Sequence, residues 1–166
     1  MNGFTRQETL ALTGATVGTL NYLDETGEVV PMRIGNPKRP LQIAYSVEQV
    51  IDLKIVSMLR PRMSLKGAVE VTLFVRGAGY RESVFQIPLA TVNGEMMRTS
   101  CWTEAGLHDD SFGRKVLEVA RSNKGRVTVH DIGMIGNVLG AIREAAVGAD
   151  VLDFEKRIKG TLLEVS

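Results

Sequence analysis

The stretch that most constrains the fold is a pair of short helical segments joined by a glycine turn near the N-terminus. Thr5 stands three residues before Glu8, which is the spacing of a capping box and predicts a helix start. Gly14 can adopt the left-handed conformation that ends a helix, and Thr16 can cap the next one. Two short helices around such a turn are typical of a helix-turn-helix, whose second helix, here residues 16–25, would enter the major groove of DNA.

A basic block follows these helices. Residues 29–69 contain seven bases and two acids, a net charge of +5, whereas the whole chain carries +1. Arg33, Lys38 and Arg39 flank Gly35-Asn36-Pro37, a combination typical of a hairpin tip. A local field of one sign inside a neutral protein indicates a phosphate backbone as the partner.

Short motifs recur in a fixed order through this part of the chain. They are Phe4-Thr5, Thr13-Gly14, Thr19-Leu20, Tyr22, Asp24-Glu25, Gly27, Pro31, Tyr45-Ser46, Glu48, Leu53, Leu59-Arg60 and Met63-Ser64-Leu65. In order and spacing they resemble the DNA-binding domain of the MerR superfamily of regulators, over less than half of the chain. The resemblance implies a winged helix-turn-helix that binds double-stranded DNA.

The chain departs from the family pattern in the second helix. Gly18 and Asn21 stand where the family usually has arginines, and Leu23 replaces its second Tyr or His. Asn21 could instead bond an adenine edge through both its amide atoms. More of the affinity is then expected from the hairpin and from the bases that follow it.

The predicted DNA-contacting residues lie in the two short helices, the hairpin and the helix after it. They are Thr5, Arg6, Thr16, Thr19, Asn21, Tyr22, Arg33, Lys38, Arg39, Tyr45, Lys54, Arg60 and Arg62. Within this set we expect Thr16 and Tyr22 to contact the DNA backbone and Asn21 to contact a base.

A turn at residues 76–79 predicts a boundary between a DNA-binding domain, residues 1–76, and an α+β module, residues 80–166. Asn93-Gly94 predicts a hairpin inside this module. Further expected elements are a helix from about Ser111, a strand at 126–130, a helix at 131–148 and a last strand at 162–165. The overall fold class is therefore α+β.

The C-terminal module is expected to hold a homodimer together. Residues 76–166 have twelve bases and twelve acids, so this half is a poor candidate for the main DNA contact. The helix at residues 65–75 is apolar on much of its circumference, and Gly136 and Gly140 would permit close helix packing. A dimer would read a palindromic operator.

Catalytic, cofactor and metal chemistry is not expected. Cys101 is the only cysteine, which excludes an intramolecular disulfide, and His108 with its neighbouring acids is explained by a loop and a helix cap. The polar N-terminus predicts no signal peptide, and the longest apolar run is too short to cross a bilayer. We therefore expect a cytoplasmic, nucleoid-associated protein that is not an enzyme.

Three functions stay open at this stage. The first is a homodimeric, ligand-independent repressor, because the aromatic share of 5% is low for an aromatic-rich effector pocket. Short MerR-type repressors encoded beside CRISPR-associated transposons are one such group. The second is an excisionase-like accessory factor for recombination or transposition. The third is an effector-binding or enzymatic C-terminal half, which a deep apolar pocket would favour.

Overall fold

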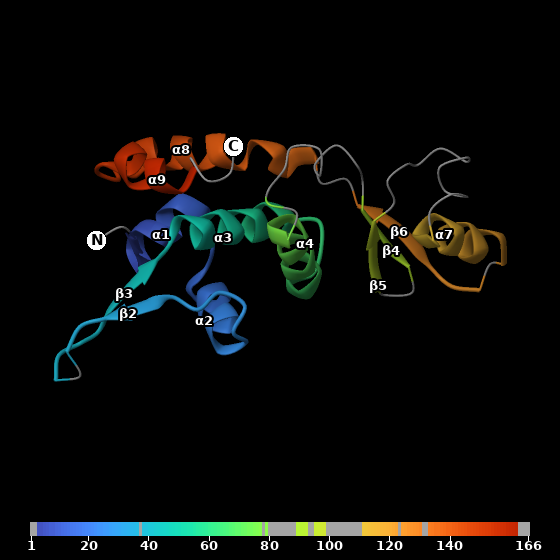
Figure 1. Cartoon of the computed structure of the whole chain (residues 1–166), viewed down its shortest axis with the longest axis horizontal. Coiled ribbons are helices and arrows are strands. Elements are labelled where there is room, and N and C mark those ends of the chain that lie inside the picture. Colours follow the sequence, from blue (N-terminus) through green and yellow to red (C-terminus); the bar gives the residue numbers. More distant parts are fainter. Residues whose placement is uncertain are drawn as a thin grey trace. The chain divides into compact units, whose positions relative to one another are not determined.

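The computed structural model describes residues 3–36, 38–77, 79, 89–92, 95–98, 111–122, 124–130 and 133–162. The chain forms two compact units, one made of Met1–Gly79 with Asn137–Ser166 and the other of Tyr80–Gly136. We call them unit 1 and unit 2. Helices and small antiparallel sheets occur in the same chain, so the fold is α+β, as the sequence predicts (Figure 1).

Unit 1 begins with strand β1 (Phe4–Thr5) and helices α1 (Arg6–Thr13) and α2 (Val17–Glu25). The predicted capping box is present, because the Thr5 hydroxyl accepts from the Glu8 N–H and the Glu8 carboxylate accepts from the Thr5 N–H. Gly14 ends α1 at a φ of 70°, a conformation that costs glycine little. Thr16 caps α2 through the Thr19 N–H, so local chemistry sets both helix starts.

A β-hairpin follows, made of β2 (Met32–Ile34) and β3 (Gln42–Tyr45). The strand order is β1-β3-β2, all antiparallel, with Phe4 opposite Tyr45 and Met32 opposite Ala44. The hairpin's inner end joins the core through Ala44 and Tyr45, while its outer end extends away from the helices (Figure 1).

Helix α3 (Val47–Leu59) runs through the middle of unit 1, and α4 (Leu65–Gly77) packs against it. Ser46 and Gln49 form a second capping box at the start of α3. Leu53, Ile55 and Leu59 of α3 are completely buried. This apolar helix therefore provides much of the core on which the smaller elements are arranged.

The C-terminal helices α8 (Val138–Gly148) and α9 (Phe154–Leu162) also belong to unit 1. Helix α8 packs on α1 and α3, and α9 packs on α3. They cover the side of these helices that faces away from α2 and the hairpin (Figure 1). The division of the chain thus differs from the predicted one, in which residues 80–166 form one module.

The reason for this difference is the buried face of the two C-terminal helices. Ile142 and Ala146 of α8, and Phe154 and Ile158 of α9, are each less than a tenth exposed. An amphipathic pattern predicts that a helix buries one face, but it does not identify the core that receives that face. The predicted last strand begins at Leu162, which ends α9 here, and residues 163–166 lie outside the described part.

Unit 2 contains an antiparallel sheet of β4 (Leu89–Val92), β5 (Glu95–Arg98) and β6 (Val127–His130), in the order β5-β4-β6. Helix α7 (Ser111–Ser122) packs on β4 and β6, and a 3-10 helix, η1 (Gly133–Asn137), leads into α8. Strands β4 and β5 pair across the predicted Asn93-Gly94 turn, whose own residues lie outside the described part, as do Cys101 and His108. In the described ranges, no helix combines the length and apolarity that crossing a membrane requires.

Candidate nucleic-acid interface

The candidate interface is the side of unit 1 that carries α2 and the β2–β3 hairpin (Figure 1). Leu20 and Leu23 of α2 are buried against the core. The opposite face of the helix carries Val17 and Tyr22, which are 50% and 44% exposed, together with exposed Asn21. Within unit 1, helix α2 therefore presents an exposed strip of mixed polar and apolar side chains.

The threonines at the start of α2 are used locally. The Thr16 hydroxyl accepts from the Thr19 N–H at 3.1 Å, and the two hydroxyl oxygens are 3.0 Å apart. Thr5 is likewise the cap of α1. These three predicted contact residues thus have a structural role that fixes the helix ends, and Thr16 also stays exposed.

Asn21 is held by Arg6, the first residue of α1. An Arg6 Nη2 N–H donates to Asn21 Oδ1 at 2.5 Å. Because a guanidinium has no acceptor atom, this contact fixes the amide with its oxygen toward Arg6 and its NH2 group away from it. The adenine readout predicted for Asn21 needs that oxygen as an acceptor, so the structure does not hold Asn21 in the predicted arrangement.

Arg33 on β2 is tied to α2. Its Nη2 lies 2.5 Å from Asp24 Oδ2, and hydrogen bonding by Asp24 raises the pKa of Arg33 above its ordinary value. The side chains of Arg33 and Asp24 are 45% and 27% exposed. This ion pair connects the hairpin to the helix and offsets a positive charge that was predicted to contact phosphate.

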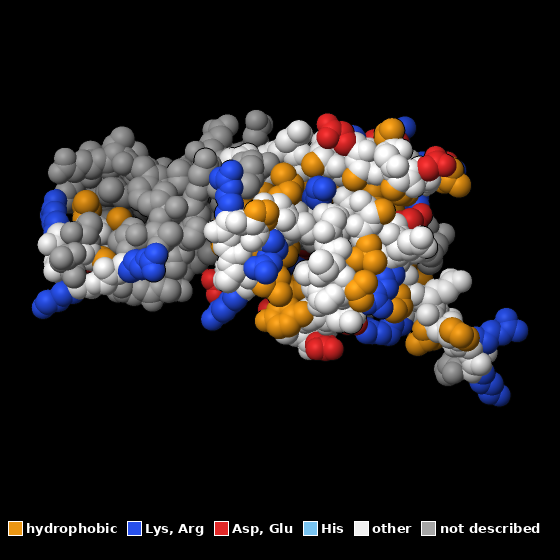
Figure 2. All heavy atoms as spheres, turned by 180° about the vertical axis from the view of Figure 1, so that it is seen from behind, with side chains coloured by type: hydrophobic (Ala, Val, Ile, Leu, Met, Phe, Trp, Pro, Cys, Tyr) orange, Lys and Arg blue, Asp and Glu red, His pale blue; other side chains and the backbone are white. Residues whose placement is uncertain are grey.

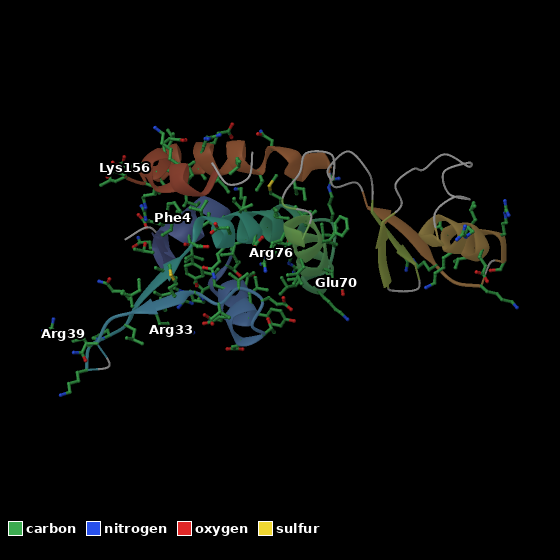
Figure 3. All side chains as sticks on the ribbon, in the orientation of Figure 1. Phe4, Arg33, Arg39, Glu70, Arg76 and Lys156 are labelled. Atoms are coloured by element: carbon green, nitrogen blue, oxygen red, sulfur yellow. The ribbon has the colours of Figure 1, made fainter. Side chains whose placement is uncertain are left out.

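Lys38 and Arg39 lie at the outer end of the hairpin, and both are exposed. Asn36 shapes the turn, because its side-chain oxygen accepts from the Lys38 N–H at 3.0 Å and its carbonyl accepts from the Arg39 N–H at 2.9 Å. Neither base forms an ion pair with any residue of the described ranges. Figures 2 and 3 show the basic side chains of the tip, including Arg39, directed outward.

Tyr45 does not belong to the surface on which it was predicted. It is only 3% exposed and pairs with Phe4 in the sheet. Burial raises the pKa of its hydroxyl, which therefore stays protonated at neutral pH. Alternation along a strand predicts that every second residue faces inward. Strand β3 does not follow this rule, because the two successive residues Ala44 and Tyr45 are both buried.

The remaining predicted bases lie on α3 and in the turn after it. Lys54 is half-buried on α3, whereas Arg60 and Arg62 are exposed in the α3–α4 connection. Arg60 Nη1 donates to the Met63 carbonyl at 3.0 Å, so this guanidinium supports the turn. Neither Arg60 nor Arg62 forms an ion pair with a described residue.

A hollow between α2 and α4 was not predicted. It has a volume of about 230 Å³ and is lined by Tyr22, Thr26, Glu28, Lys66, Val69, Glu70 and Leu73. The four α4 residues follow the i, i+3, i+4, i+7 spacing of one helix face, a signal that the sequence already contained. The hollow carries two acids and one base, so its charge does not extend the basic surface of the hairpin tip.

Comparison with known proteins adds no further constraint. No known protein family matches this chain, and no curated protein is significantly similar to it. Among the described residues, no three His, Cys, Asp or Glu side chains are grouped so that they could hold a metal ion.

Proposed function

We propose that this protein is a sequence-specific, double-stranded-DNA-binding regulator of transcription. In this proposal α1 and α2 form a helix-turn-helix of MerR type, and the β2–β3 hairpin is its wing. The observation that carries it is the placement of two features on one side of unit 1. These are the exposed strip of α2, centred on Asn21, and the exposed hairpin tip with Lys38 and Arg39.

Each feature fits a different part of a DNA duplex. A helix with exposed amide, hydroxyl and apolar side chains can contact base edges in the major groove. A projecting hairpin with two bases can contact the phosphate backbone beside that groove. Of the two acids of the basic block, Asp52 is buried against Arg76, whereas Glu48 is exposed at the start of α3. Asp24, which precedes the block, is paired with Arg33.

The regulator is proposed to be a ligand-independent repressor that acts as a homodimer. One winged helix covers few base pairs, and a second copy on a two-fold axis would double the contacts and require a palindrome. Helix α4 buries Ala68, Val71 and Val75 within unit 1, so it offers less dimer surface than its sequence suggests. Unit 2, with its three-stranded sheet and α7, is therefore the candidate dimerisation module.

One observation favours a second candidate function, that of an excisionase-like accessory factor for recombination or transposition. Helices α8 and α9 of the same chain cover α1 and α3, so the core of unit 1 is closed without a partner subunit. A unit of this kind could bind direct repeats as single copies along bent DNA. The arrangement of the sites then distinguishes the two functions.

The test is a selection from a pool of random DNA duplexes with the full-length protein, followed by light scattering on the free protein and on the complex. Recovery of one palindromic motif bound by a dimer supports the repressor. Recovery of a single half-site motif, bound by one copy per site, favours the accessory factor. Recovery of random sequence at physiological salt contradicts sequence-specific binding and both functions.

A further inference from the structure

The Arg6–Asn21 contact determines what α2 can read. Arg6 Nη2 donates to Asn21 Oδ1, and the guanidinium offers only donors, so the amide cannot be turned without placing two donors against each other. Neither side chain has another hydrogen bond among the described residues. The outward side of the pair therefore consists of the Asn21 NH2 group and the remaining N–H groups of Arg6.

A surface made only of donors selects a partner with adjacent acceptors. In the major groove, guanine presents two neighbouring acceptors, O6 and N7, whereas adenine places its N6 amino donor beside N7. The donor pair would oppose that amino group. Asn21 released from Arg6 could face adenine with its oxygen toward N6 and its amino group toward N7, so Arg6 changes the preferred base by fixing the amide.

Phosphate oxygens are acceptors too, and they are the other source of this chemistry. The position of Asn21 argues for the base. It lies in the middle of the exposed face of α2, one turn after Val17, rather than at an end of the helix. Arg6 alone could bind a phosphate through its charge, whereas fixing the orientation of the neutral Asn21 amide matters where donors and acceptors must be told apart.

We propose that Arg6 and Asn21 act together as a donor-only pair that selects guanine over adenine in the DNA site. This inference rests on the proposed DNA-binding function, since it assigns the base that α2 reads. Arg6 is then a specificity-determining residue because it orients the Asn21 amide, and the Asn21 NH2 group is the direct reader.

Two substitutions separate the roles. Asn21→Asp keeps an oxygen for Arg6 but replaces the outward donor with an acceptor. It should lower the preference for guanine at one position of the motif by roughly tenfold or more. Arg6→Met keeps much of the side-chain length but frees the Asn21 amide to turn. The same position should then change from guanine to adenine.

The experiment selects binding sites from random duplexes with the wild-type full chain and with each variant. Asn36→Asp and Arg39→Met are matched controls, because they make the same chemical changes at the hairpin tip. They should weaken all duplexes alike and leave the motif unchanged. Thermal unfolding of each variant verifies that its fold is retained, and both test residues lie at the surface of unit 1.

The outcomes are distinct. A wild-type guanine that becomes adenine in Arg6→Met and is lost in Asn21→Asp supports the inference. A wild-type motif that both substitutions leave unchanged, or that has adenine at the affected position, overturns the inference but not the proposed function. An equal loss on all duplexes with a smaller salt dependence shows a phosphate clamp and also overturns it. Failure of the wild-type protein to select any motif overturns the proposed function itself.

Discussion

Arg157 on α9 holds Glu8 on α1 in a two-bond ion pair across 149 residues of sequence. Arg157 Nη1 lies 2.8 Å from Glu8 Oε1, and Nη2 lies 3.0 Å from Oε2. The same guanidinium donates to the Gly3 carbonyl and stacks 4.2 Å above the centre of the Phe4 ring. Phe4 also contacts Phe154, with ring centres 5.7 Å apart. The C-terminal helix therefore fixes the first turn of α1, which carries Arg6.

The first prediction is an acid sensitivity that depends on Glu8. The Arg157 hydrogen bond lowers the pKa of Glu8 from 4.5 to about 2. A depressed pKa in the folded state stabilises the protein above pH 4.5, and this contribution is lost as the pH falls toward 2. Glu8→Gln does not titrate, so it should lack this loss, which is at most about 3 kcal/mol in the free energy of unfolding.

Urea unfolding of the wild type and of Glu8→Gln at several pH values between 5 and 2 measures this difference. Glu155→Gln is the control, because Glu155 is 58% exposed in its ion pair with Arg143 and should contribute little. The two stability curves of wild type and Glu8→Gln should converge as the pH falls. Parallel curves would show that Glu8 has an ordinary pKa.

The second prediction concerns the ion pair between Asp52 of α3 and Arg76 of α4. The Asp52 side chain is 2% exposed, whereas that of Arg76 is 39% exposed. Arg76→Met therefore removes a charge partner from a buried carboxylate, and should cost about 3 kcal/mol. Asp52→Asn leaves a partly solvated arginine and should cost less. Thermal unfolding gives the order, and an equal or reversed order contradicts the explanation from burial.

The elements predicted correctly are those whose signals are local. The Thr5–Glu8 and Thr16 caps and the Gly14 turn each depend on residues within a few positions of one another, so the sequence displays them directly. Arg157 and Glu8 meet only after α8 and α9 return to unit 1, and no spacing rule connects them. Arg76 was likewise assigned to a turn, and the sequence could not show its ion pair with Asp52, which lies on another helix.

The candidate interface shows the same division. Composition located the basic block and the hairpin tip, since Lys38 and Arg39 are near each other in the chain. It could not show that Arg33 pairs with Asp24, that Arg6 holds Asn21, or that Tyr45 is buried. These are side-chain contacts between α1, α2 and the hairpin, and they exist only once the three elements are packed together.

The third prediction tests the role of Gly140 on α8. A Cβ atom at this position would lie 2.2 Å from Asn137 Oδ1, so the glycine makes room for a side chain of its own helix start. Asn137 is exposed and its side chain can turn away, and alanine favours the helix, so Gly140→Ala should change stability by no more than about 1 kcal/mol. Adding Asn137→Ala removes the overlapping side chain, so the double variant should be more stable than Gly140→Ala alone. The molecular mass by light scattering should be the same for all three proteins, whereas a change in mass would assign Gly140 to a dimer contact.

The last prediction is that the hairpin tip contacts phosphate groups, and that the ion pair with Asp24 keeps Arg33 from making a further phosphate contact. Lys38 and Arg39 are exposed and form no ion pair within the described ranges, so replacing both with Ala should weaken every duplex similarly. The magnitude of the slope of log K against log salt should fall by about 1 to 2.

Arg33→Ala should change the slope less, since Arg33 is already paired with Asp24 at 2.5 Å. Asp24→Asn releases Arg33 and should raise affinity for all duplexes, with a steeper slope by about 1. Binding measured by fluorescence anisotropy at four salt concentrations gives each slope, and equal slopes for the wild type and the Lys38/Arg39 double variant would remove the hairpin tip from the interface.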